Sequence, residues 1–193
     1  MNKILVAILG KAGSGKDSLI AEICRTPKFD FNKIIPYTTR PKRDYEKEGN
    51  PYHFVTNEEF AELVLNGEMI EATIFNNWAY GTTKSSLSGD INIGAYNPEA
   101  YDCLSIPPEG ITILPYYIVC DDKLRMLRQL NREEEPNVHE IARRFLADDE
   151  DFVEIEANNN IPVLENNTWQ DCYDNASKII QDVASLSSLD HNI

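Results

Sequence analysis

Short apolar runs alternate with segments of helical periodicity along the chain. Residues 4–8 form a continuous apolar run, which is typical of a strand buried on both faces, and residues 17–23 follow with the spacing of a helix. Further strands are predicted at 34–35, 69–75, 91–95, 112–120 and 161–164. Pro115 should confine the regular part of the 112–120 strand to its second half. The alternation predicts an α/β fold with a central parallel sheet covered by helices on both faces.

Helix-capping side chains mark where other helices begin. Thr56 and Glu59 form a capping-box pattern ahead of the apolar residues at 60–64. Asp122 can cap a helix over 124–130, and Thr168 can cap a final helix over 170–186, after which 187–193 should fray. The chain has no internal repeat or low-complexity linker, so we expect one domain over residues 1–193.

A glycine-rich phosphate loop lies between the first predicted strand and helix. It reads Gly10-Lys11-Ala12-Gly13-Ser14-Gly15-Lys16. Its glycines let backbone N–H groups curl around phosphate oxygens, and the next helix points its positive end at the same anion. Lys16 adds a mobile charge that can reach the β- and γ-phosphates. A purely steric glycine turn is the alternative, but the strand, loop and helix context favours nucleotide binding.

Asp17 stands where this motif normally has the Ser or Thr whose hydroxyl ligates Mg²⁺. A carboxylate keeps a hard oxygen but adds negative charge beside a polyphosphate. Ser18 cannot simply take over, because one step along a helix rotates the side chain by about 100°. Two interpretations stay open for Asp17: a magnesium ligand acting through a bound water, or a helix residue favoured by the dipole.

The overall charge limits the partners. Thirty-two acidic and eighteen basic residues give a net charge of −14, which argues against a surface that coats nucleic acid. Basic residues nevertheless collect in segments 37–52 and 125–144, where an anionic ligand and a solvated charged face are the two explanations. The four cysteines have no paired spacing and no segment is long enough to span a bilayer, so we expect a cytoplasmic protein with reduced thiols and no membrane partner.

Several ordered motifs after the phosphate loop resemble the guanylate kinase family. They are Thr38-Thr39-Arg40-Pro41-Lys42-Arg43, Tyr52-His53-Phe54-Val55, Ile70-Glu71 and Tyr80-Gly81-Thr82. The resemblance is close over the phosphate loop and residues 38–83, and elsewhere it rests on pattern alone. It implies a P-loop kinase three-layer fold with a core over 1–35 and 84–190, a small GMP-binding subdomain over 36–83 and a helical lid at about 125–150.

The resemblance also implies a GMP site. Its residues would be Arg40, Arg43, Tyr52, Glu71, Tyr80, Thr82 and Asn97. The two arginines would hold the GMP phosphate with planar forks, helped by the tyrosine hydroxyls. Glu71 would accept hydrogen bonds from guanine N1–H and the exocyclic amine, while Thr82 would donate to O6. Adenine presents the opposite pattern at N1, so such a site would reject it.

On the donor side, the resemblance implies an ATP site with a mobile lid. The ATP phosphates would lie against residues 10–16, Asp17, Ser18 and Arg128, with Asn166 on the adenine side. The catalytic residues would be Lys16, Arg40, Arg43, Arg132 and Arg144, although the choice between Arg143 and Arg144 is open by one position.

The chain departs from the family where the base and the metal would bind. Residues 91–98 contain no aspartate, whereas the family has an Asp-x-Asp-x-x-Gly stretch there that serves a magnesium water and the guanine amine. Pro36 replaces a small hydroxyl residue, and Asn97 is a partial substitute for the lost aspartate. We therefore consider that Asp17 holds a magnesium-bound water from a new direction.

The expected activity is phosphoryl transfer from Mg²⁺-ATP to GMP or dGMP by a monomer or homodimer. A kinase with broader nucleoside monophosphate specificity is one alternative. The other is a catalytically silent guanylate-kinase-like module that binds a protein. Lys16, Arg132 and Arg144 favour an enzyme, because silent relatives typically lose them.

Overall fold

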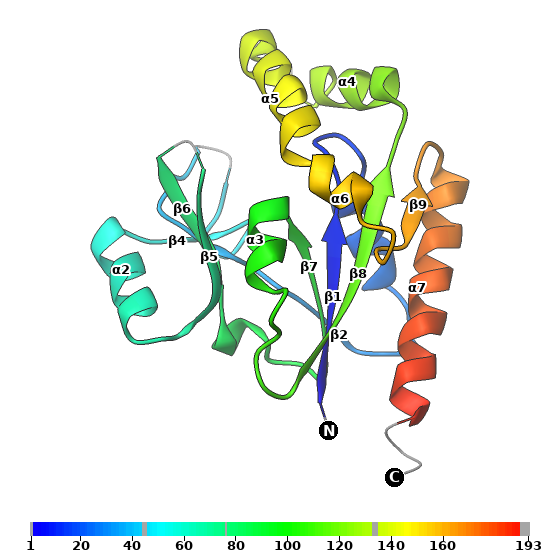
Figure 1. Ribbon diagram of the computed structural model, residues 1–193. Coiled ribbons are helices and arrows are strands. Elements are labelled where there is room, and N and C mark those ends of the chain that lie inside the picture. Colours follow the sequence, from blue (N-terminus) through cyan, green and yellow to red (C-terminus); the bar gives the residue numbers. More distant parts are fainter. Residues whose placement is uncertain (1, 44–45, 76, 133–134, 190–193) are drawn as a thin grey trace.

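A five-stranded parallel sheet forms the centre of the protein (Figure 1), in the order β2-β7-β1-β8-β9. The computed structural model describes residues 2–43, 46–75, 77–132 and 135–189. The strands of this sheet are β1 (Lys3–Leu9), β2 (Phe31–Lys33), β7 (Ile91–Tyr96), β8 (Ile111–Val119) and β9 (Val163–Glu165). All four neighbouring pairs are parallel, which confirms the predicted α/β class.

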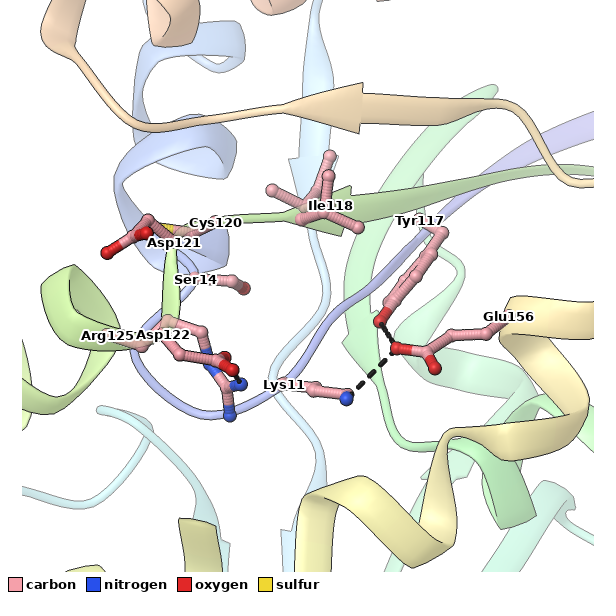
Figure 2. Close-up of a pocket in the computed structure, with 10 residues that line it drawn as sticks. Lys11, Ser14, Tyr117, Ile118, Cys120, Asp121, Asp122, Arg125 and Glu156 are labelled. Carbon is pink, nitrogen blue, oxygen red and sulfur yellow. Dashed lines mark hydrogen bonds and ion pairs between the residues drawn. The ribbon is translucent and has the colours of Figure 1, made fainter.

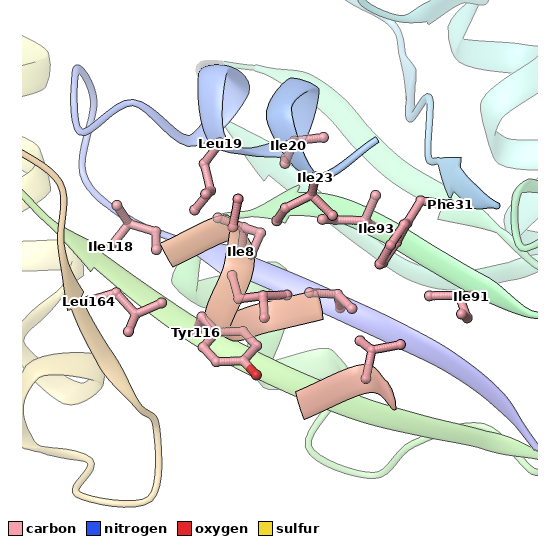
Figure 3. Packing of buried hydrophobic residues seen from close by; sticks show 14 of the residues in the cluster. Ile8, Leu19, Ile20, Ile23, Phe31, Ile91, Ile93, Tyr116, Ile118 and Leu164 are labelled. Atoms are coloured by element: carbon pink, nitrogen blue, oxygen red, sulfur yellow. The ribbon is translucent and has the colours of Figure 1, made fainter. Parts of the chain in front are cut away.

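Helices cover both faces of this sheet because successive β1 residues point to opposite sides. Ile4, Val6 and Ile8 pack with residues of α1 (Lys16–Ile23) and α7 (Trp169–Leu189), and Figure 3 shows this cluster. Leu5 and Ala7 pack on the other face with residues of α3 (Pro98–Cys103). The result is the predicted three-layer arrangement, with phosphate loop residues at the carboxyl end of β1.

A second, smaller sheet lies beside the first (Figure 1) and has the order β4-β3-β6-β5. Its strands are β3 (Tyr37–Thr38), β4 (His53–Phe54), β5 (Met69–Phe75) and β6 (Trp78–Thr83), accompanied by α2 (Asn57–Leu65). β5 and β6 are antiparallel, and a register shift between Met69 and Glu71 brings Glu71 opposite Thr82. These elements coincide with the segment expected to bind GMP.

Three further helices complete the chain. They are α4 (Asp122–Leu130), α5 (Val138–Asp151) and α6 (Val153–Ala157), and a 3-10 turn, η1 (Lys84–Ser86), follows β6. In Figure 1, α4 and α5 stand above the carboxyl ends of β1 and β8, where the lid was expected.

The structure corrects two strand predictions. The strand predicted at 34–35 is β2 at Phe31–Lys33, and the pattern misses it because Asn32 at its centre is polar. The Asn32 amide donates to Asn92 Oδ1 at 2.7 Å, so the polar group is satisfied inside the sheet. Pro115 does not shorten β8, which pairs with β1 from Ile111 to Tyr117, on both sides of the proline. β9 pairs only with Tyr117–Val119, so β8 has one neighbour at Pro115, where a missing N–H is tolerated.

Helix boundaries are corrected by one to three residues. Thr56 and Glu59 form the predicted capping box at α2. The cap of α4 is Asp121, whose carboxylate accepts from the Leu124 N–H at 3.1 Å, so Asp122 is the first helical residue instead. α7 continues through Leu189, which overturns fraying at 187–189, while 190–193 lie outside the described residues.

Candidate nucleotide site

The phosphate loop forms an open anion cradle between β1 and α1. Gly13 and Gly15 have left-handed φ angles of 80° and 97°. A Cβ on Gly13 would lie 2.6 Å from the Arg125 carbonyl oxygen, so a larger residue does not fit. Among the described residues, no acceptor receives a hydrogen bond from the backbone N–H of Gly13, Gly15, Lys16 or Asp17. These donors, at the positive end of α1, are suited to phosphate oxygens.

Lys16 lies inside this cradle. Its Nζ donates to the carbonyl oxygens of Gly10 at 2.5 Å and Lys11 at 3.2 Å. Burial lowers the pKa of Lys16 to about 8, and the charges of Asp17 and Asp148 oppose that effect. An incoming phosphate would therefore meet a cation that is held by carbonyl groups and has no ion-pair partner among the described residues.

Arg128 and Asn166, both expected to contact ATP, donate hydrogen bonds to backbone carbonyl groups of the phosphate loop. The Arg128 guanidinium donates to the carbonyls of Gly13 and Ser14, each at 3.3 Å, and to the Asn166 carbonyl at 3.2 Å. Asn166 is 2% exposed, and its Nδ2 donates to the Ser14 carbonyl at 2.8 Å. Both side chains thus position the loop backbone, while a direct contact to ATP stays a prediction.

Acidic residues of α5 contact the tip of the loop. The backbone N–H of Ala12 donates to Asp148 Oδ2 at 2.7 Å, and the buried Arg125 binds the same carboxylate at 2.8 Å. Arg125 Nε also donates to the Ala12 carbonyl at 3.1 Å. The sequence pattern did not single out Asp148, because an acidic run in a helix looks like a solvated face.

Lys11, also in the loop, forms ion pairs with carboxylates of α5 and α6, and Figure 2 shows the one with Glu156. Its Nζ lies 2.9 Å from Asp149 and 3.0 Å from Glu156, whose carboxylate also accepts from the Tyr117 hydroxyl at 2.8 Å. Burial opposes the charge, but the two carboxylates outweigh it and raise the pKa of Lys11. Lys11, Tyr117 and Glu156 border a cavity of about 300 Å³. Lys11, expected to bind phosphate, is therefore paired with protein carboxylates.

Arg40, in the acceptor segment, is buried and already holds an anion. Its guanidinium donates to both carboxylate oxygens of Glu46, at 2.7 and 3.0 Å, and Glu46 also accepts from the Arg43 N–H at 2.9 Å. Burial would raise the pKa of Glu46, but these bonds hold it below its usual value. The Tyr52 ring lies 5.5 Å from the Arg40 guanidinium carbon. Glu46 was missed because nothing in its sequence neighbourhood marks it as a partner of Arg40.

Glu71, Thr82 and Tyr96 form a buried polar group beside the second sheet. Glu71 is 6% exposed, and burial raises its pKa to about 7 although hydrogen bonding to Thr82 opposes the shift. Tyr96 is 5% exposed, and its pKa is raised by burial and by the Glu71 charge. Asn97 has a structural role instead: its Oδ1 caps α3 by accepting from the Ala100 N–H at 2.7 Å. Its contact with the base stays a prediction.

The lid arginines differ in direction. Arg143 donates two 2.8 Å bonds to Glu140 and lies 5.8 Å from the centre of the Phe75 ring. Arg144 lies 4.0 Å from Glu140. Burial lowers the pKa of Lys16 and raises that of Tyr52, and the Arg144 charge acts on both. The Arg144 charge therefore lies within range of both the loop lysine and Tyr52, while its role at the phosphates stays a prediction.

Arg132 and Tyr80 complete the predicted set. Arg132 is exposed just after α4, and its side chain makes no hydrogen bond within the part of the chain that the structure describes. The Tyr80 ring packs edge to face on Tyr52, with 5.7 Å between ring centres. Arg43 is exposed, and the Glu140 carboxylate of α5 lies within reach of its charge.

The described residues contain no cluster of three or more His, Cys, Asp or Glu side chains that could hold a metal ion. Asp17 is exposed on the first turn of α1, beside Lys16. Magnesium in nucleotide sites is commonly held by one or two carboxylates together with phosphates, so a single carboxylate here fits that ion.

Two general properties accompany the site. The four cysteines, Cys24, Cys103, Cys120 and Cys172, are free thiols. Across the described ranges, every helix is too short or too polar to cross a membrane.

Comparisons with known proteins agree with the site. The family model for guanylate kinase matches residues 2–94. The guanylate kinase of Thermotoga maritima is 40% identical over 91 residues, which are 47% of this chain and 43% of that protein. That of Mycoplasma mycoides is 34% identical over 90 residues, covering 47% of this chain and 30% of that protein. The matched region thus spans less than half the length of these curated relatives.

The fold is similar over a much longer stretch. A crystal structure of guanylate kinase from Anaplasma phagocytophilum aligns with a TM-score of 0.63 over 95% of this chain and 86% of that one, at 20% identity. The sequence match includes the phosphate loop and the acceptor segment. The structural match extends beyond them and concerns the fold. Over residues 2–94 the chain therefore resembles the guanylate kinase family in sequence, and over 95% of its length it has a similar fold.

Proposed function

We propose that the protein transfers the γ-phosphoryl group of ATP to GMP or dGMP and forms the nucleoside diphosphate. The observation that carries the proposal is the convergence of three segments distant in sequence. Lys16 and Asp17 lie at the start of α1, Tyr52 lies just before β4 and Arg144 lies in α5. The charges of Asp17 and Arg144 act on both Lys16 and Tyr52. A donor phosphate on the loop and an acceptor phosphate near Tyr52 would therefore lie close together.

The donor would bind through the free backbone N–H groups and Lys16. Those N–H groups have no acceptor among the described residues, so no protein hydrogen bond to them would have to break when phosphate binds. The acceptor phosphate would bind Arg40 and Arg43, with Tyr52 and Tyr80 as hydroxyl donors. Arg40 is suited to this role, because its Nη2 already binds both oxygens of an anionic group, the Glu46 carboxylate.

Guanine would be recognised by Glu71 and Thr82. An ionised Glu71 offers two acceptor oxygens to N1–H and the exocyclic amine, and Thr82 offers a hydroxyl donor to O6. Both side chains are buried, so a base that leaves either one unpaired is penalised.

Magnesium would be held by Asp17, through a water, together with the phosphates of ATP. When bound, the ion neutralises charge that develops on the transferring group. The chain's own cations do the rest. Lys16, Arg132 and Arg144 would stabilise the phosphates as they approach in line, and the acceptor oxygen is already ionised, so no general base is needed.

The proposal includes a cytoplasmic location and small-molecule nucleotide partners. The free cysteines suit the reducing cytoplasm, and the net charge of −14 suits nucleotide partners better than nucleic acid. A monomer or a homodimer stays a prediction.

A coupled assay of ADP release tests the activity with GMP, dGMP, AMP, CMP and dTMP at equal Mg²⁺-ATP. GMP and dGMP should be the preferred acceptors, and the Lys16→Ala variant should be inactive with each. Transfer to several bases at similar rates would favour the broader kinase, which the absence of aspartate from 91–98 motivates. A folded protein that transfers phosphate to none of them would refute the enzyme and favour the protein-binding module.

A further inference from the structure

The hydroxyl of Tyr96 is buried and forms no well-aligned hydrogen bond among the described residues. Tyr96 ends β7 and is 5% exposed. Its hydroxyl oxygen is inaccessible to solvent. A buried hydroxyl that makes no hydrogen bond destabilises the folded protein. A hydrogen bond to a bound ligand would explain why a tyrosine stands at this position.

The surroundings of this hydroxyl are those of the proposed base pocket. Glu71 and Thr82 face each other across β5 and β6. The Glu71 charge helps to raise the pKa of the Tyr96 hydroxyl, and the nearby Thr82 side chain opposes that shift. Ile70, the neighbour of Glu71, packs against the hydrophobic cluster that contains Tyr96. The tyrosine therefore approaches this polar pair from the central sheet.

Gly94 makes room for the tyrosine. A Cβ at Gly94 would lie 3.0 Å from Tyr96 Cε2 and 3.3 Å from its hydroxyl oxygen. The absence of a side chain at 94 therefore lets the ring lie close over the strand. Gly94 and Tyr96 lie on the same face of β7, because side chains two apart in a strand share a face.

We propose that Tyr96 is a specificity residue of the acceptor site, whose hydroxyl accepts a hydrogen bond from the 2-amino group of a purine. The inference rests on the proposed function, which puts guanine against Glu71 and Thr82. An ionised Glu71 would take N1–H and one hydrogen of the 2-amino group, which leaves the second hydrogen without an acceptor. A phenol has two lone pairs and one donor hydrogen, so Tyr96 can accept that hydrogen and donate its own to Glu71.

Comparing GMP with IMP, which lacks only the 2-amino group, isolates this contact. The ratio of kcat/KM for GMP to that for IMP should fall about tenfold in Tyr96→Phe, because one hydrogen bond to GMP is lost and none to IMP. The matched control is Tyr101→Phe. Tyr101 packs against the same cluster from α3, so the control removes a hydroxyl nearby without changing the ratio.

Calorimetric titration with GMP and with IMP gives the same ratio without turnover. A wild-type protein that binds GMP more tightly than IMP but does not transfer phosphate would refute the proposed activity, while the ratio of affinities in Tyr96→Phe would still decide the role of Tyr96. A ratio within twofold of wild type in both measurements would overturn the Tyr96 proposal alone. A wild-type protein that binds neither nucleotide would overturn both.

Thermal unfolding of the free protein separates this role from a structural one. The melting temperature of Tyr96→Phe should equal or exceed that of wild type, because the variant keeps the buried ring and removes an unpaired hydroxyl. A lower melting temperature together with equal losses for GMP and IMP would assign Tyr96 to the core and refute its role in specificity.

Discussion

Replacing Glu71 with Gln should stabilise the ligand-free protein at neutral and alkaline pH. Glu71 is 6% exposed, and burial raises its pKa from 4.5 to about 7, while hydrogen bonding to Thr82 opposes the shift. Each unit of pKa corresponds to about 1.4 kcal/mol. Keeping this carboxylate ionised therefore costs the folded protein roughly 3 kcal/mol above pH 7. Glutamine has nearly the same shape and no charge, so it avoids that cost.

The sign of the pH dependence follows from which state releases its proton first. Between the unfolded and folded pKa values, the unfolded chain has lost its proton at Glu71 while the folded protein keeps it. The stability of the wild type therefore falls as pH rises through that window. Below it, both states carry the proton and the penalty vanishes. The advantage of Glu71→Gln should be roughly 3 kcal/mol at pH 8 and less than about 1 kcal/mol at pH 5.

Urea unfolding followed by far-UV circular dichroism at pH 5 and pH 8 measures this difference. The control is Glu68→Gln, an exposed position just before β5, where removing the charge should change stability by less than about 0.5 kcal/mol at either pH. The variant at 71 should also bind GMP more weakly, because an amide presents one acceptor oxygen where an ionised carboxylate presents two. An equal gain at both pH values, or no gain at pH 8, would refute the argument from burial.

Three further variants test the phosphate side. Lys16→Ala should abolish ADP release, and an active variant would contradict the donor assignment. Its urea midpoint should stay at or above that of wild type, because Lys16 is partly buried and its charge is disfavoured there. Arg144→Ala should lower kcat by about 10²-fold or more, because it removes a cation at the transferring phosphate. The control, Arg143→Ala, should change kcat less than about threefold. Equal effects of the two variants in a steady-state assay would show that the lid faces the loop differently. Asp17→Asn should raise the Mg²⁺ concentration for half-maximal rate about tenfold, and an unchanged magnesium titration would remove Asp17 from the metal site.

The parts of the fold that were predicted from the sequence are those whose signals are local. The apolar run of β1, the glycines of the loop and the capping box at Thr56 each lie within a few residues of one another. β2 was misplaced because its central residue, Asn32, is satisfied by Asn92, a residue 60 positions away in the chain. A polar pair inside a sheet leaves no trace in a pattern of apolar positions.

The same distinction applies to the site. Motifs predicted Arg40, Glu71 and Lys16, but the carboxylates that bind cations of the site were not predicted. Glu46 and Asp148 are two of 32 acidic residues, and only the tertiary structure brings them to Arg40 and Arg125. Tyr96 was missed for the opposite reason, because a tyrosine in an apolar strand has the pattern of an ordinary core residue.

On the proposed function, the ion pairs of the ligand-free protein would make nucleotide binding an exchange of partners. Arg40 would have to break its ion pair with Glu46 to bind a phosphate, and Lys11 would have to break its ion pairs with Asp149 and Glu156. The net affinity is then the difference between two sets of ionic contacts. Where a phosphate contact replaces an ion pair within the protein, as at Arg40 and Lys11, added salt weakens both states. Nucleotide affinity should therefore depend on ionic strength less than the number of cations suggests.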